Sequence, residues 1–222
     1  MAKTNPLLQA SIPVSRAEEV ALGIRESISQ GEIAPGQRLA EVQLAEKYQV
    51  SRNTLREAFR LLSQQDLVLH VPNRGASVAI PSVTSIIDIY RVRRLVEVQA
   101  VAATFPKHPG VEQMRNAVDV AVAASEAGDW IRVGTANFSF HSAIIMLTDS
   151  PRLRRLFDQM TAELRLAFGI VGDLEYLHAP FIDKHREIVS LIQKGDTGAA
   201  AKMLESYLVQ AERLLLAAYD RT

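Results

Sequence analysis

The most restrictive feature of this 222-residue sequence is a change of pattern at Pro81. Before Pro81, helical signals are followed by two short β-like segments, "LVLHV" and "ASVAI". After Pro81 there are only long amphipathic segments, without a further strand signal. We therefore predict a mainly α protein in two parts: a small mixed domain over residues 1–81 and an all-α domain over residues 82–222.

The boundaries of the later helices have chemical markers. Pro106 and Pro109 separate two of them, and Ser150–Pro151 is an N-cap followed by proline at the first helical position. A "GD" pair ends one helix and caps the next at two further places. These markers predict a six-helix bundle with helices near 83–105, 110–127, 129–148, 151–170, 179–194 and 196–220.

The first 81 residues predict two helices, a turn, a third helix and a hairpin. Ser15 with Glu18 forms a capping box that starts the first helix. A short helix in "AEVQLAEKYQ" leads through a tight connection to Ser51, which caps a helix from Arg52 to about Gln65. The residues "PNRG" suit the turn of a hairpin. This order is the winged helix-turn-helix layout, whose second paired helix lies in the major groove of DNA.

Charge must be considered locally, because the chain carries 25 basic and 25 acidic residues and is neutral overall. Five basic residues lie between Lys47 and Arg74, against only two acidic ones. Arg52 and Arg56 share a helix face, where either could reach guanine or a phosphate. A row of arginines alone would more simply be a solvated surface. Its place on the second paired helix, with Arg74 at the hairpin tip, favours contact with nucleic acid.

The composition also sets the expected compartment. The chain has no cysteine, which suits a reducing cytoplasm. No apolar run approaches the roughly 20 residues that span a bilayer, and the first residues lack the pattern of a secretory signal. We expect a cytoplasmic protein with no membrane partner.

The segment "PGQRLAEVQLAEKYQVSRNTLREAFRLLSQQDLV", followed by "PNRGASVA", resembles the DNA-binding domain of the GntR family of bacterial transcription regulators. Asn53-Thr54 stands where many relatives have Thr-Pro, and Val42 where some have arginine, so the resemblance does not specify the operator sequence. It implies double-stranded operator DNA as the partner. The implied contacts come from Arg38, Ser51, Arg52, Asn53, Thr54 and Arg56 in the helices, and from Asn73, Arg74 and Gly75 in the wing.

Few polar residues of the helical region could bind a ligand. In "YRVRRLVEVQA", Arg93 and Glu97 lie one turn apart. They are either a surface pair worth a few tenths of a kcal/mol, or a guanidinium inside the bundle that needs a carboxylate partner. Asn137 and His141 share one helix face. His141 could be an ordinary core residue, or it could line one polar cavity with residues of later helices, namely His185 and Tyr207.

The helical region resembles the ligand-binding domain of the FadR subfamily, through "VRRLVE", "ANFSFHSAI", "HREIVSLIQKGD" and the final helix. Six helices rather than seven resemble its vanillate-regulator branch. The resemblance implies a small organic acid or related metabolite as effector, bound through Arg93, His141 and His185. Many members hold a divalent metal with one aspartate and three histidines; the corresponding residues here are Asn137, His141, His185 and Tyr207.

Two of those four residues are unsuited to a metal. An amide at Asn137 and a phenol at Tyr207 replace a carboxylate and an imidazole, which weakens the site for Zn²⁺. We therefore expect no obligatory cofactor. A metal, if bound, would have His141 and His185 as ligands, together with Asn137.

These features predict a ligand-responsive repressor, not an enzyme, that binds a pseudo-palindromic operator as a homodimer. One alternative is a metal-dependent enzyme with His141 and His185 as ligands, although no general base is evident beside them. Another is an architectural DNA-binding protein with no effector.

Overall fold

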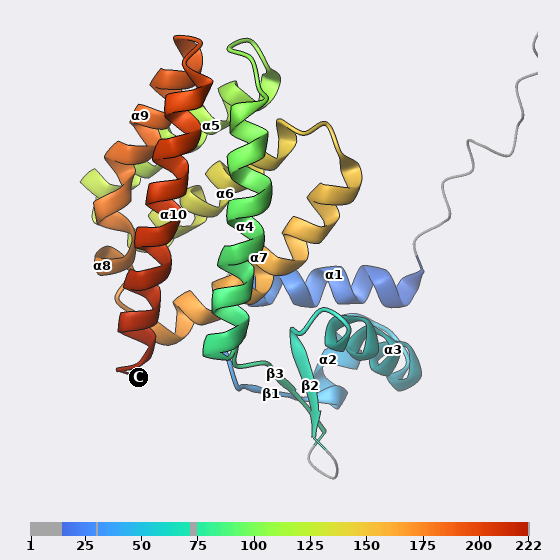
Figure 1. The fold of residues 1–222 in the computed structure, drawn as a ribbon. Helices are drawn as coiled ribbons and strands as arrows, with labels where there is room; N and C mark the ends of the chain where they lie inside the picture. Colours follow the sequence, from blue (N-terminus) through green and yellow to red (C-terminus); the bar gives the residue numbers. More distant parts are fainter. Residues whose placement is uncertain (1–14, 30, 72–74, 222) are drawn as a thin grey trace, which may run out of the picture. The chain divides into compact units, whose positions relative to one another are not determined.

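A computed structural model of the chain describes residues 15–29, 31–71 and 75–221 (Figure 1). The protein is mainly α-helical, as predicted, and divides into two compact units, residues 1–78 and 79–222. The division falls between Val78 and Ala79 rather than after Pro81, so the residues before the first long helix of the bundle belong to the helical unit.

The first unit has the predicted winged helix-turn-helix order with one additional strand. The predicted hairpin is an antiparallel pair, and the extra strand adds to it in the order β1-β3-β2. The extra strand was not predicted because two residues are too short to show alternation. The elements are α1 (Arg16–Ser29), β1 (Arg38–Leu39), α2 (Glu41–Lys47), α3 (Arg52–Ser63), β2 (Val68–Val71) and β3 (Gly75–Val78).

A local sequence signal explains the start of α1. The capping box forms as predicted: Ser15 N–H donates to Glu18 Oε2 at 2.6 Å, and Glu18 N–H donates to Ser15 Oγ at 3.2 Å. The apolar face of α3 is buried, including Phe59 and Leu62, and it packs against α1. This packing fixes α3 and leaves its polar face exposed.

The second unit contains all six predicted helices and one more. The additional helix, α8 (Leu174–His178), follows Gly172, whose φ of 74° ends the preceding helix. It begins with a cap in which Asp173 accepts from Tyr176 N–H at 3.0 Å. Counting this five-residue helix, the described part of the unit has seven α-helices, whereas six were predicted. The long helices are α4 (Val83–Ala102), α5 (Pro109–Glu126), α6 (Trp130–Met146), α7 (Pro151–Val171), α9 (Ile182–Gln193) and α10 (Thr197–Tyr219).

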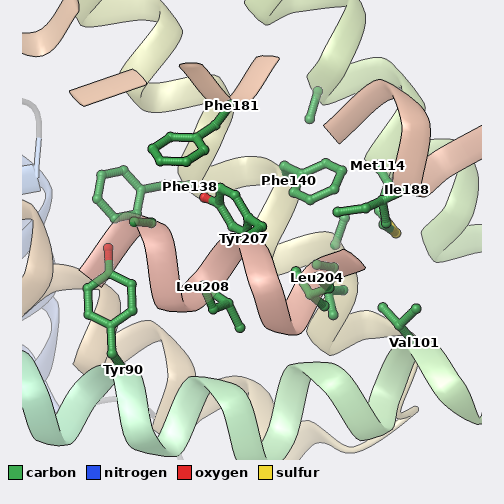
Figure 2. Packing of buried hydrophobic residues seen from close by; sticks show 14 of the residues in the cluster. Tyr90, Val101, Met114, Phe138, Phe140, Phe181, Ile188, Leu204, Tyr207 and Leu208 are labelled. Carbon is green, nitrogen blue, oxygen red and sulfur yellow. The ribbon is translucent and has the colours of Figure 1, made fainter. Parts of the chain in front are cut away.

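The core of the second unit encloses several polar side chains. Helix α10 lies beside α4 and α9, and α5 packs against α6 (Figure 1). Figure 2 shows the ring of Tyr207 on α10 among the rings of Phe138, Phe140 and Phe181. Polar and charged residues of α4, α6, α8 and α9 are buried in the same interior. None of the described helices is both long and apolar enough to cross a membrane.

A hydrogen bond ties the end of α10 to the start of this unit. The hydroxyl of Tyr219 donates to the carbonyl oxygen of Pro81 at 2.5 Å. Ser82 then caps α4 by accepting from Ser85 N–H at 3.0 Å. The last helix of the chain therefore contacts the segment from which the first helix of the bundle starts.

Candidate functional site

The amino end of α3 is exposed and carries no acidic residue in its first turn. Ser51 Oγ accepts from Thr54 N–H at 3.1 Å and lies 2.9 Å from Thr54 Oγ1. Arg52 and Asn53 project from this end and are exposed. Because a helix carries partial positive charge at its amino end, this region favours an anionic group such as a phosphate.

The arginines of α3 differ in their partners. Arg56 Nε donates to Glu41 Oε2 at 3.1 Å, and Arg60 pairs with Glu57 at 2.5 Å. These pairs are solvent-exposed on the arginine side, where an ion pair contributes little to stability. Arg52 takes part in none of the side-chain hydrogen bonds or ion pairs found within the described ranges. Its guanidinium is therefore available to a ligand without breaking an existing pair.

Two of the other residues predicted to contact DNA, Arg38 and Gly75, lie on strands. Arg38 was predicted to act from a helix, which is wrong: it lies on β1, opposite Ser77 of β3, with its side chain exposed. Gly75 is the first residue of β3 and has a φ of 81°, a conformation that glycine adopts readily. Asn73 and Arg74 lie outside the described residues.

The second unit contains a buried ion pair. Arg93 is 4% exposed and Glu97 is 0% exposed, so the alternative of a surface pair is wrong. Arg93 Nε donates to Glu97 Oε1 at 2.7 Å. The guanidinium carbon also lies 4.9 Å from the ring centre of Tyr90. Burial raises the pKa of Glu97, but attraction to Arg93 and the hydrogen bond from His141 outweigh that effect and hold the pKa below its ordinary value.

A chain of polar contacts continues from this ion pair across three helices. Glu97 Oε2 lies 2.5 Å from His141 Nδ1, and His141 Nε2 lies 2.9 Å from the Tyr207 hydroxyl. The same hydroxyl lies 3.3 Å from Asn137 Oδ1. We call Arg93, Glu97, Asn137, His141 and Tyr207 the buried polar chain. It connects α4, α6 and α10.

The protonation states along this chain follow from burial. Burial lowers the pKa of His141, although Glu97 raises it, and the net shift is downward, so the imidazole is neutral near pH 7. The carboxylate of Glu97 only accepts, so His141 Nδ1 carries the proton and Nε2 is an acceptor; the single proton of the Tyr207 hydroxyl has His141 Nε2 and Asn137 Oδ1 as alternative acceptors. Burial also raises the pKa of the Tyr207 hydroxyl well above its ordinary value. Both nitrogens of His141 are therefore occupied.

Three buried polar atoms beside this chain have no protein partner in the described structure: Arg93 Nη2, His178 Nε2 and His185 Nε2. The ring of His185 stacks on Phe140, with centroids 4.0 Å apart. Burial lowers the pKa of His185 well below its ordinary value and that of His178 to about 4. Because a buried polar atom without a partner costs about 1–3 kcal/mol, these atoms mark where a ligand could supply hydrogen bonds.

The structure brings the predicted effector residues together and adds two. The ring of His141 lies 5.5 Å from that of His185 and 5.4 Å from that of Tyr207. The sequence indicates Glu97 only as a partner for Arg93, but in the structure the Glu97 carboxylate also bonds His141. His178 was missed because α8 was not predicted, although Gly172–Asp173 repeats the Gly-Asp pair that marks two other helix boundaries.

A separate hollow of about 470 Å³ lies among α5, α6 and α7. Its lining includes Arg132, Arg165, Ser139 and Ser142. It contains none of the residues predicted to bind the effector. Arg132 therefore offers a control position for locating a ligand.

Known proteins match both units. Residues 16–78 match the bacterial regulatory proteins of the gntR family, and residues 88–210 match the FCD domain. The galactonate operon transcriptional repressor of Escherichia coli K12 is 23% identical over 225 residues, covering 91% of this chain and 97% of the relative. The regulator YdhC of Bacillus subtilis strain 168 is 24% identical, covering 80% of each chain.

Solved structures agree with these matches. A structure from Rhodococcus sp. RHA1, described as a transcriptional regulator GntR, is 36% identical, covers 91% of this chain and 98% of its own, and superposes with a TM-score of 0.85. The fold is also that of Escherichia coli McbR/YncC, with 21% identity, coverage of 93% and 99%, and a TM-score of 0.77. The chain therefore belongs to the GntR family of bacterial transcription regulators, in the FadR-like branch whose DNA-binding domain is followed by an FCD domain.

Proposed function

We propose that this regulator is a repressor that binds a pseudo-palindromic operator as a homodimer and leaves it when a small organic acid binds the helical unit. The exposed amino end of α3, with Arg52 free to reach a base edge or a phosphate, supports DNA recognition by this helix. A two-fold dimer would place two such helices on matching half-sites.

The observation that carries the effector part is the buried Arg93 Nη2, which has no protein partner within the described ranges. A guanidinium N–H that is shielded from water favours a carboxylate oxygen. The neutral His185 beside the buried polar chain can add a hydrogen bond through Nε2. Arg93 and Glu97 together are neutral, so one ligand carboxylate already gives this interior a net negative charge, and a second carboxylate on the ligand would cost more still. We therefore favour a monocarboxylate.

Ligand binding can shift the protein between two dimer arrangements only if its affinity for the two differs. A carboxylate that bonds Arg93 would compete with Glu97 for the guanidinium and so disturb the buried polar chain. The ligand would then bind more tightly to the dimer arrangement in which the buried polar chain is disturbed, and would favour that arrangement.

The test is fluorescence anisotropy with labelled DNA from upstream of the protein's own gene. We expect a sequence-selective complex whose affinity falls as salt rises, with a log–log slope of about 0.9 per phosphate contacted. A panel of monocarboxylates is then added, and at least one should release the DNA. Sequence-selective binding that no acid affects would favour the architectural alternative, and the absence of selective binding would contradict the proposal.

The same assay locates the ligand. Replacing both Arg93 with Met and Glu97 with Gln, so that no buried carboxylate is left unpaired, should abolish release while DNA binding persists. Arg132→Ala, in the separate hollow, is the matched control and should keep both. The reverse pattern would move the effector to that hollow.

A further inference from the structure

The resemblance of the helical unit implies a divalent metal at Asn137, His141, His185 and Tyr207, which would require four side chains with suitable donor atoms. Asn137 offers a neutral amide oxygen in place of a carboxylate. The Tyr207 hydroxyl is buried and lies 2.9 Å from His141 Nε2, so a hydrogen-bonded phenol stands where an imidazole would offer a lone pair to the metal. Half of the implied ligand set therefore lacks the donors that Zn²⁺ prefers.

The remaining donors are also poorly placed. His141 uses both ring nitrogens, Nδ1 toward Glu97 and Nε2 toward Tyr207, so its lone pair is not free for a metal. The buried Nε2 of His185 has no protein partner within the described residues, but a single imidazole is not enough to hold a metal ion. Across the described ranges, no three His, Cys, Asp or Glu side chains are grouped so that they could hold a metal ion. The residues do not fit the metal that the resemblance implies.

A different cation already lies in this interior. The guanidinium of Arg93 is buried and is held by Glu97 at 2.7 Å, and Glu97 is in turn held by His141 at 2.5 Å. Tyr207 then connects His141 to Asn137. The positions of the implied ligands are thus used for an internal hydrogen-bonded chain that orients a permanent positive charge.

We propose that the effector site of this protein is independent of metal, with Arg93 as its cation and with Asn137 and Tyr207 as the residues that exclude a divalent ion. The identity of the site as an effector site rests on the proposed function. The exclusion of metal by these two residues does not, and it can be measured without DNA or an organic ligand.

The experiment compares the wild-type protein with Asn137→Asp/Tyr207→His, which restores a carboxylate and an imidazole. Both proteins are purified without chelator and without a metal-affinity column. They are incubated with excess Zn²⁺, passed through gel filtration, and analysed for bound zinc by mass spectrometry. We expect well under one zinc per chain for the wild type and close to one for the double variant, whose thermal midpoint should rise with Zn²⁺.

Two controls assign the zinc to this site. His141→Ala introduced into the double variant should abolish the gain. Tyr207→Phe, which frees His141 from its hydrogen bond without adding a ligand, should bind no more zinc than the wild type. Circular dichroism confirms folding of each variant. If the double variant does not fold, the zinc content of Tyr207→His alone is compared with that of the wild type.

Two results would overturn the proposal. One is a wild-type protein that retains one zinc per chain and loses it in His141→Ala. The other is a folded double variant that binds no more zinc than the wild type, because Asn137 and Tyr207 would then not be what excludes the metal. Neither result depends on the operator assay, so failure of the proposed function remains distinguishable.

Discussion

Replacing Glu97 with Gln tests whether the ion pair with Arg93 is a buried charge pair. The substitution preserves volume and removes one charge at a side chain with no solvent exposure. Gln keeps an oxygen for Arg93, but it leaves the guanidinium without a counter-charge and presents an amide to His141. Removing one partner of a buried ion pair costs about 3–5 kcal/mol.

This cost can be measured as a fall in the thermal midpoint of the helical unit. For a unit of this size, 1 kcal/mol corresponds to about 2–4 °C, so Glu97→Gln should lower the midpoint by roughly 6–20 °C. Differential scanning calorimetry of the full chain resolves the change. Asp88→Asn is the matched control on the same helix, because Asp88 pairs with Arg91 at the exposed surface and should cost less than about 1 kcal/mol.

A double variant separates the lost pair from the stranded charge. Adding Arg93→Met to Glu97→Gln removes the unbalanced guanidinium, so the double variant should be more stable than Glu97→Gln alone. If Glu97→Gln lowers the midpoint no more than Asp88→Asn, the reasoning about this pair is refuted.

The pKa of Glu97 is lowered in the folded state, so the contribution of Glu97 to the free energy of unfolding is present above the ordinary value of 4.5 and is lost as pH falls through the folded value. Glu97→Gln should abolish that loss.

Three further outcomes can be checked. Arg52→Ala should weaken operator binding by about 1–3 kcal/mol in the anisotropy assay, whereas Arg91→Ala, on the other unit, should have no effect. Ser51→Ala removes the cap that bonds Thr54 N–H and should lower the urea midpoint of the first unit's transition, at a cost of about 1 kcal/mol. Burial lowers the pKa of His178 from 6.5 to about 4. As pH falls, His178 is therefore protonated in the unfolded chain before it is protonated in the folded one, and the free energy of unfolding decreases. His178 should account for about 2 kcal/mol of the loss between pH 7 and pH 5, and His178→Gln should remove that part in urea titrations; an unchanged pH profile would contradict the assigned burial.

The helices were predictable where the sequence carries local markers. The Ser15 capping box and the Ser51 and Ser150 caps satisfy backbone N–H groups of their own helices, so their effect can be read from neighbouring residues. Strand β1 is too short to show a period and depends on its pairing with β3, whereas α8 carries a local marker that the predicted helix boundaries did not use, the Gly172–Asp173 pair.

The site was predictable as a set of residues but not as an arrangement. Helical spacing places Arg93 one turn from Glu97, yet it does not say whether the pair faces water or the interior. The choice is made by α6 and α10, which bring His141 and Tyr207 against Glu97 from distant parts of the chain. Such long-range packing has no local signature in the sequence.

Helix α10 contacts both the buried polar chain and Pro81, at the start of the helical unit. Tyr207 joins the buried polar chain, and twelve residues later, about 18 Å along the same helix, Tyr219 bonds the carbonyl of Pro81. Pro81 lies three residues after Val78, where the wing strand β3 ends. A ligand that separates Tyr207 from His141 would rotate or shift α10. That displacement would act on Pro81 through Tyr219, and so on the segment that follows strand β3 of the first unit.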